Sequence, residues 1–123
     1  MKDGKYVILC IDDDPDLLLS LRVVLEANGY LVAAASAEEG IRTYKESNPD
    51  VLIVDLMMEE IDAGIRVVQE LQALGNKAPL YLLSSTGDYL CGMVDLNEQG
   101  VTAVFQKPLN PDFLLSLLKA KLP

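Results

Sequence analysis

The fold is decided by residues 6–11, YVILCI, and by the three acids that follow them, Asp12, Asp13 and Asp14. The apolar run contains no polar alternation, which is typical of a parallel strand that is buried on both faces. Its end therefore brings several carboxylates to one edge of a sheet. Adjacent like charges repel each other, and a fold tolerates them where a cation or solvent compensates.

Three further apolar runs lead into polar residues. Asp55 follows residues 51–54, Ser84 and Ser85 follow residues 80–83, and Lys107 comes two residues after the run at 101–105. In sheets of parallel strands the ligand site lies at the carboxyl ends of the strands, so we expect these side chains to meet there. Carboxylates, a hydroxyl and a lysine at one sheet edge predict a metal-dependent phosphate site.

The segments between these strands carry apolar residues at helical spacing. The expected helices cover about residues 15–27, 36–47, 63–74, 89–99 and 111–121, and a short second strand covers residues 30–34. Asp14 is expected to cap the first helix, and Ser36 and Glu39 to form the capping box of the second. Five strand–helix units with short connections predict an α/β domain with a parallel sheet and helices on both faces.

Composition narrows the function classes. The 123 residues, half of them hydrophobic, suit a single domain over residues 1–123. The net charge of -9 disfavours direct nucleic-acid binding, and the absence of His removes the usual general base and zinc ligand. Cys10 and Cys91 lack metal-ligand spacing, and Cys10 is interpreted as a small core residue. Because we find no leader and no apolar run long enough to span a bilayer, we expect a cytoplasmic protein with no membrane contact.

Four segments together resemble the receiver domain of bacterial response regulators, in the CheY-like superfamily. They are residues 11–15 (IDDDP), residues 50–57 (DVLIVDLM), Ser84 with Ser85, and Lys107 with Pro108. No single segment is specific to this family. The four segments together are, because they occur in the family's order and spacing over nearly the whole chain. The resemblance implies a flavodoxin-like (βα)5 fold, a three-layer sandwich whose five-stranded parallel sheet has the order 2-1-3-4-5.

The resemblance also implies a phosphorylatable switch of a two-component system. Asp55 would accept a phosphoryl group from a phosphohistidine of a sensor kinase. Asp13 would bind Mg2+ or Mn2+ directly, and Asp12 would help either through water or by supporting the ligands from outside, with Asp55 and the backbone carbonyl of Met57 as further ligands. The charges support a metal site independently of the family resemblance, because a divalent cation offsets the repulsion between an attacking carboxylate and an anionic donor.

Two further residues receive roles from the same resemblance. Lys107 would pair with Asp55 before phosphorylation and with the phosphate afterwards, while Ser84 would donate a hydrogen bond to a phosphoryl oxygen and move as the switch. The implied partners are a sensor histidine kinase or a phosphotransfer protein and a downstream effector protein or domain, and a homodimer is left open. No enzymatic activity is expected beyond self-phosphorylation and autodephosphorylation.

Each site residue also has a structural interpretation when it is taken alone. The three acids suit the start of a helix, Asp55 suits a strand-end cap, Ser84 suits a hydrogen bond within its own loop, and Lys107 suits the surface. Their combination favours the receiver interpretation. The sequence leaves open whether this is a free-standing regulator, a phosphorelay intermediate or a domain of a longer protein.

The chain departs from the receiver pattern at three places. Val104 stands where receivers usually carry Tyr or Phe, and Phe105 is expected on the opposite face of its strand. Glu59 replaces the usual proline of the loop after Asp55, and Gly64 comes one residue later than the usual glycine. These departures predict an altered output switch and an altered loop.

Three other functions compete with the receiver. A small Mg2+-dependent phosphatase of the haloacid-dehalogenase type shares an acid-any-acid pattern, but Asp16 stands where Thr or Val is expected. A flavin-binding electron carrier of the same topology needs a Ser/Thr/Gly-rich phosphate loop, where this chain has three aspartates. A pseudo-receiver that only binds partners suits Val104 but not the intact set of site residues.

Overall fold

The computed structural model describes residues 4–12, 14–55, 63–84, 102–106 and 110–122. In chain order, its elements are β1 (Val7–Ile11), α1 (Pro15–Ala27), β2 (Leu31–Ala35), α2 (Ala37–Ser47), β3 (Val51–Asp55), α3 (Ala63–Ala73), β4 (Leu80–Ser84), β5 (Ala103–Gln106) and α4 (Pro111–Lys121). The predicted helix at residues 89–99 lies outside the described residues.

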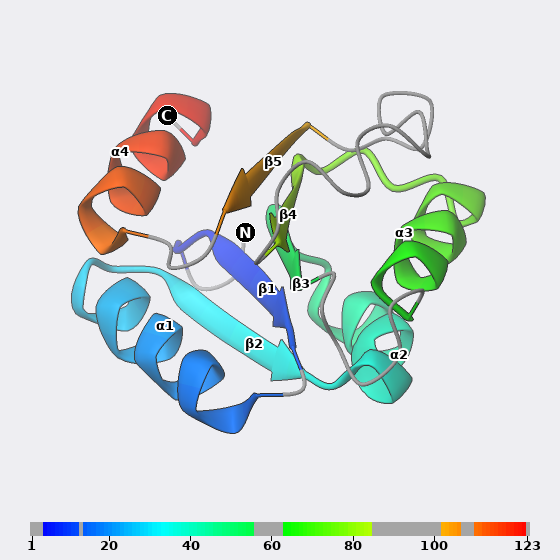
Figure 1. The fold of residues 1–123 in the computed structure, drawn as a ribbon. Helices are drawn as coiled ribbons and strands as arrows, with labels where there is room; N and C mark the ends of the chain where they lie inside the picture. The colour runs from blue at the N-terminus through cyan, green and yellow to red at the C-terminus, as the bar shows by residue number, and fades with distance from the viewer. Residues whose placement is uncertain (1–3, 13, 56–62, 85–101, 107–109, 123) are drawn as a thin grey trace.

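The strands form one parallel sheet in the order β2-β1-β3-β4-β5 (Figure 1). Every residue of β1 and of β3 is buried, as the unbroken apolar runs predicted. The strand order reverses next to β1, where the chain passes from β2 on one side of β1 to β3 on the other. The parallel flavodoxin-like sheet and its strand order are therefore confirmed.

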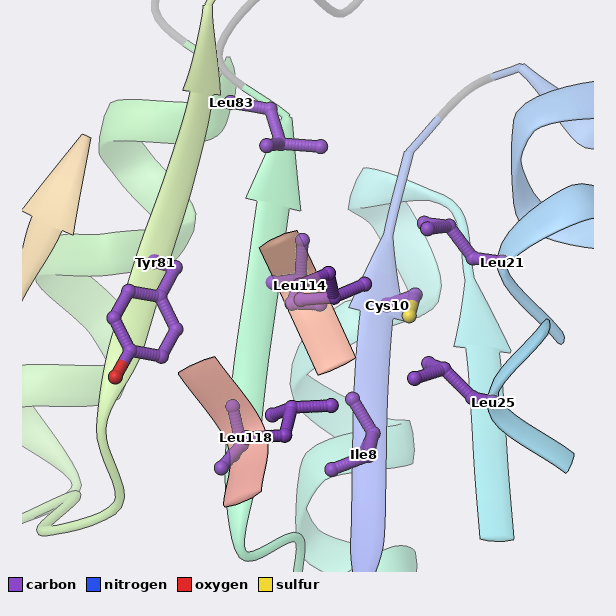
Figure 2. Close-up of a cluster of buried hydrophobic side chains, with 10 residues drawn as sticks. Ile8, Cys10, Leu21, Leu25, Tyr81, Leu83, Leu114 and Leu118 are labelled. Carbon is purple, nitrogen blue, oxygen red and sulfur yellow. The ribbon is translucent and has the colours of Figure 1, made fainter. Parts of the chain in front are cut away.

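Two hydrophobic clusters cover the two faces of the sheet. The first joins β1, β3 and β4 to α3, and α2 packs against it; its buried members are Leu9, Ile11, Leu52, Val54, Val67, Val68, Leu71, Leu80 and Leu82. The second joins the same strands to α1 and α4; its buried members are Ile8, Cys10, Leu21, Leu25, Val51, Ile53, Tyr81, Leu83, Leu114 and Leu118 (Figure 2). Alternate residues of each strand thus enter opposite clusters, which gives the predicted helix–sheet–helix layers.

Side-chain caps start two of the helices. Asp14 accepts hydrogen bonds from two first-turn N–H groups of α1, at 2.9 and 3.4 Å, which confirms the predicted cap. Asn110 caps α4 in the same way, at 2.8 and 3.3 Å. Ser36 stands at the N-cap of α2 but makes no side-chain cap bond, so the predicted capping box is wrong. The Glu39 carboxylate instead pairs with Arg42, one turn along the same helix, at 3.2 Å.

Among the residues that the structure describes, no helix is both long and apolar enough to span a bilayer.

Candidate functional site

The carboxyl ends of β1 and β3 bring Asp12 and Asp55 to the same level of the sheet. Ile11 pairs with Val54 across these strands, and Asp12 and Asp55 are the next residue on each side. Neighbouring strands lie about 4.8 Å apart, which sets the spacing of the two backbones. Strand alternation places both carboxylates on the face that α1 and α4 cover, two positions beyond Cys10 and Ile53.

Both carboxyl groups are buried, because Asp12 is 4% exposed and Asp55 is 2% exposed. Within the described part of the chain, they are the charged residues that the fold buries. Burial of carboxylates is costly unless hydrogen bonds or opposite charge compensate. Two buried carboxylates at one sheet edge are therefore an arrangement that a positively charged group would stabilise.

Hydrogen bonds fix Asp12 at the end of β1. Its N–H donates to the carbonyl oxygen of Ala35 at 3.0 Å, which continues the ladder to β2 by one residue. Its Oδ1 accepts from the N–H of Asp14 at 2.9 Å. The second bond ties the carboxylate to the start of α1, so the orientation of Asp12 depends on both the sheet and the helix.

The other predicted site residues are described only in part. Ser84 ends β4 directly after Leu83, which pairs with Asp55, so its backbone reaches the same sheet edge. The side chain of Ser84 and the whole of Asp13, Met57 and Lys107 lie outside the described residues. The structure thus brings Asp12 and Asp55 together and does not test the other four.

Cys10 lies beneath this site in the core, as predicted. Figure 2 shows it on β1, facing Leu21 and Leu25 of α1. Burial raises the pKa of the Cys10 thiol to about 12, with a further increase from the Asp12 carboxylate and a partial decrease from Arg22. A thiol that stays protonated is a poor nucleophile, so Cys10 takes no part in the chemistry of the site.

The carboxylates suit a magnesium ion. Mg2+ prefers oxygen ligands and is usually bound through one or two carboxylates, while it keeps several waters. Asp12 and Asp55 supply two carboxylates at one level, so the chemistry of these donors fits the ion. A larger group of three or more candidate ligand side chains does not occur among the described residues, to which Asp13 and Met57 do not belong.

Sequence reasoning missed Gly40 of α2, which lies across the sheet from the carboxylates and approaches the last residue of β1. A Cβ atom placed on Gly40 would lie 2.9 Å from Cδ1 of Ile11, the residue before Asp12. The signal in the sequence was a glycine inside a helical segment, but a glycine alone does not tell which strand residue lies opposite it.

The sequence profile of the response regulator receiver domain matches residues 8–119. The chain belongs to this family. Transcriptional regulatory protein GlrR of Escherichia coli K12 is 35% identical over 108 residues, which are 87% of this chain and 24% of the relative. Transcriptional regulatory protein PrrA of Mycobacterium tuberculosis is 34% identical over 119 residues, 94% of this chain and 49% of the relative. The chain therefore spans a quarter to a half of the length of these relatives.

Solved receiver structures have the same fold. The CheY-like receiver domain protein of Methanospirillum hungatei JF-1 is 27% identical, with a TM-score of 0.86 over 97% of this chain and 94% of that one. Chemotaxis protein CheY4 of Vibrio cholerae is 24% identical and has a TM-score of 0.83 over 97% of this chain and 100% of that one, which shows the fold alone.

Family membership settles the broad function. The chain is a receiver domain of two-component response regulators, which are signalling proteins that interact with histidine kinases and effector domains. Receivers generally bind Mg2+ at their phosphorylation site. Membership of the receiver family sets aside two hypotheses that the sequence left open, the phosphatase and the flavin-binding electron carrier.

Proposed function

We propose that this receiver is a switch whose phosphoryl acceptor is Asp55. The observation that carries the proposal is the buried pair of carboxylates, Asp55 at the end of β3 and Asp12 level with it at the end of β1. A carboxylate nucleophile beside a second carboxylate needs a divalent cation in the site, because the cation offsets the repulsion between these acids and an anionic phosphoryl donor.

The transfer is a single displacement at phosphorus. A carboxylate oxygen of Asp55 forms a bond to the phosphorus of a phosphohistidine, the P–N bond breaks, and the leaving imidazole nitrogen takes up a proton. Mg2+ is proposed to be held by Asp12, Asp13, Asp55 and the carbonyl of Met57, and Mn2+ is expected to substitute for it. When bound, the ion offsets the negative charge of both reactants.

Ser84 and Lys107 are proposed to respond to the new phosphoryl group. Ser84 closes β4 at the same sheet edge, where its hydroxyl would donate to a phosphoryl oxygen. Lys107 directly follows Gln106, the last residue of β5, which pairs with Ser84. A cation at that strand end would pair with Asp55 before the transfer and with the phosphate after it. The phosphorylated and free forms would then differ at β4 and β5, where a partner can detect the difference.

The wider proposal concerns the domain and its partners. Residues 1–123 form one receiver domain of five strand–helix units, and the helix predicted over residues 89–99 completes the fourth unit. Its partners are a sensor histidine kinase or phosphotransfer protein and an effector protein or domain, with a homodimer as one output. The net charge of -9 makes contact of this domain with nucleic acid unfavourable, and the cytoplasm is its compartment.

Intact mass after incubation with acetyl phosphate and Mg2+ tests the proposal. The chain should gain one phosphoryl group, a chelator should prevent the gain, and Asp55→Asn should abolish it because an amide is a far weaker nucleophile than a carboxylate. Unchanged uptake by Asp55→Asn would refute the assignment. A chain that takes up no phosphoryl group, either from acetyl phosphate or from a phosphorylated kinase, would instead be a pseudo-receiver.

A further inference from the structure

Gly40 lies where α2 makes its closest approach to the end of β1. The glycine is buried, and a Cβ atom on it would lie 2.9 Å from Cδ1, 3.4 Å from Cγ2 and 3.5 Å from Cγ1 of Ile11. Non-bonded carbon atoms prefer separations of roughly 3.5–4.0 Å. Any side chain at this position must therefore displace Ile11 or push α2 away from the sheet.

The backbone does not explain this glycine. The glycines with positive φ in the described part of the chain are Gly4, Gly29 and Gly75, and Gly40 is not among them. Apart from proline, glycine is the least favourable residue in the interior of a helix. The fold therefore accepts a poor helix former at this position because of space and not because of conformation.

The Ile11 atom that a side chain on Gly40 would displace is Cδ1, the far end of the isoleucine. The Ile11 side chain is 1% exposed and belongs to the cluster on the α2 and α3 face, so a displaced Cδ1 meets other buried side chains. Close-packed interiors transmit such displacements to neighbouring atoms. The nearest backbone to take up a shift of Ile11 is the end of β1, and its next residue is Asp12.

The end of β1 is also tied to the end of β2 through the backbone. The N–H of Asp12 donates to the Ala35 carbonyl at 3.0 Å, and Ala35 ends β2 directly before the N-cap of α2. Two contacts therefore bear on the backbone at Ile11 and Asp12, one from β2 at the Ala35 carbonyl and one from α2 where Gly40 approaches Ile11.

We propose that Gly40 is a positioning residue for Asp12, because its missing side chain sets the distance between α2 and the end of β1. Gly40 contacts neither carboxylate and acts through Ile11. The inference rests on the proposed function only in that Asp12 serves the phosphoryl-accepting site.

A set of four variants tests the contact. Gly40→Ala adds the Cβ atom, and Ile11→Val removes Cδ1, the atom that this Cβ would meet at 2.9 Å, so the double variant restores the space. Ile11→Val alone measures the cost of the deleted methyl group. Gly40→Ala/Ile8→Val is the matched control, because Ile8 is an equally buried isoleucine of β1 that belongs to the cluster on the other face.

Three readouts are needed, namely thermal unfolding, the Mg2+ dissociation constant from calorimetry, and the backbone amide NMR signal of Asp12. We expect Gly40→Ala to weaken Mg2+ binding on the order of tenfold and to shift the Asp12 signal, since small misplacements of a site group are costly. Gly40→Ala/Ile11→Val should return the Mg2+ dissociation constant to within about twofold of the natural chain, and the Asp12 signal to its position in Ile11→Val alone. Gly40→Ala/Ile8→Val should behave like Gly40→Ala.

The outcomes separate this inference from the proposed function. Natural affinity and an unmoved Asp12 signal in Gly40→Ala would overturn it, as would equal rescue by Ile11→Val and Ile8→Val. If Gly40→Ala alone does not fold, the two double variants decide by the same comparison. A natural chain that takes up no phosphoryl group would refute the proposed function alone, because the Asp12 signal requires neither phosphoryl group nor metal.

Discussion

Asp12 and Asp55 lie level with each other on adjacent parallel strands, and both carboxylates are buried on the face of the sheet that α1 and α4 cover. Two negative charges at this spacing repel each other, more strongly in the interior than in water. A divalent cation attracts both carboxylates and so offsets that repulsion. The pair is therefore the part of the molecule that links the fold to metal binding and phosphoryl transfer.

Asp12→Asn should weaken Mg2+ binding while the fold is retained. The amide oxygen of Asn can still accept the hydrogen bond from the N–H of Asp14, which Oδ1 of Asp12 accepts at 2.9 Å. The charge that would attract the cation is lost, so we expect an increase in the Mg2+ dissociation constant on the order of tenfold. Calorimetric titration measures the constant.

Asp14→Asn is the matched control for that change. Asp14 is exposed and caps α1, and Asn caps helices about as well as Asp does. The variant loses the same charge two residues along the chain, at an exposed position, and its Mg2+ affinity should change by less than about twofold. Equal weakening in both variants would mean that the general negative charge of the region attracts the ion, and not the buried carboxylate.

Tyr81→Phe should stabilise the protein. The Tyr81 hydroxyl is buried and has no hydrogen-bond partner among the described residues, while its ring packs against Phe105 with centroids 5.5 Å apart. Removal of the hydroxyl keeps the ring contact and relieves the cost of an unsatisfied polar group, about 1 kcal/mol in the free energy of unfolding. Urea denaturation measures the change.

Tyr44→Phe provides the contrast in the same experiment. The Tyr44 hydroxyl donates to Oδ1 of Asn76 at 3.1 Å and joins α2 to the turn after α3. Its removal should lower the free energy of unfolding by about 1 kcal/mol, because the amide oxygen loses a donor. If Tyr81→Phe destabilised the protein as much as Tyr44→Phe does, the account of the Tyr81 hydroxyl would be wrong.

Alkaline pH should destabilise the fold through Cys10. The pKa of this thiol is about 12 in the folded chain against 9.0 for an exposed cysteine. The unfolded chain therefore releases a proton above pH 9.0 that the folded chain keeps, so stability is fully present below pH 9.0 and falls as the pH approaches 12. The contribution of Cys10 is about 1.4 kcal/mol per pH unit in that window.

Comparison with Cys10→Ala isolates this contribution. Burial also raises the pKa of Tyr81, so the natural chain carries a second slope of the same sign above pH 10.0. The difference between the natural chain and Cys10→Ala cancels that slope and leaves the thiol alone. Unfolding free energies measured across the window should converge as the pH rises, and a constant difference would contradict the burial argument.

The sequence predicted the sheet well because burial on both faces leaves an unbroken apolar run. Element ends were less predictable, because they depend on hydrogen bonds that come from elsewhere in the fold. Tyr30 was predicted in the second strand, but its N–H donates to the Leu25 carbonyl at 3.1 Å and closes α1, so β2 begins at Leu31. The third helix was predicted to reach residue 74, but α3 ends at Ala73, and Leu74 is 46% exposed.

The candidate site, like the fold, was predictable where it depends on buried strands and less so where it depends on contacts between distant segments. Asp12 and Asp55 were found because each follows a buried strand and parallel strands end at one edge. The capping box at Ser36 was wrong: Ser36 makes no side-chain cap bond, and Glu39 pairs with Arg42 on its own helix. The role of Gly40 depends on the distance between a helix and a strand, and no pattern along the chain encodes that distance.

The central claim is that Asp55, among all the acids of the chain, accepts the phosphoryl group, and the most direct test locates that group. Borohydride reduces an acyl phosphate to an alcohol and leaves free carboxylates intact. The chain should be treated with acetyl phosphate and Mg2+, reduced, digested and analysed by mass spectrometry. The account predicts the alcohol at Asp55 alone. An alcohol at Asp12 or another acid, with an unreduced Asp55 in a chain that has gained a phosphoryl group, would contradict it.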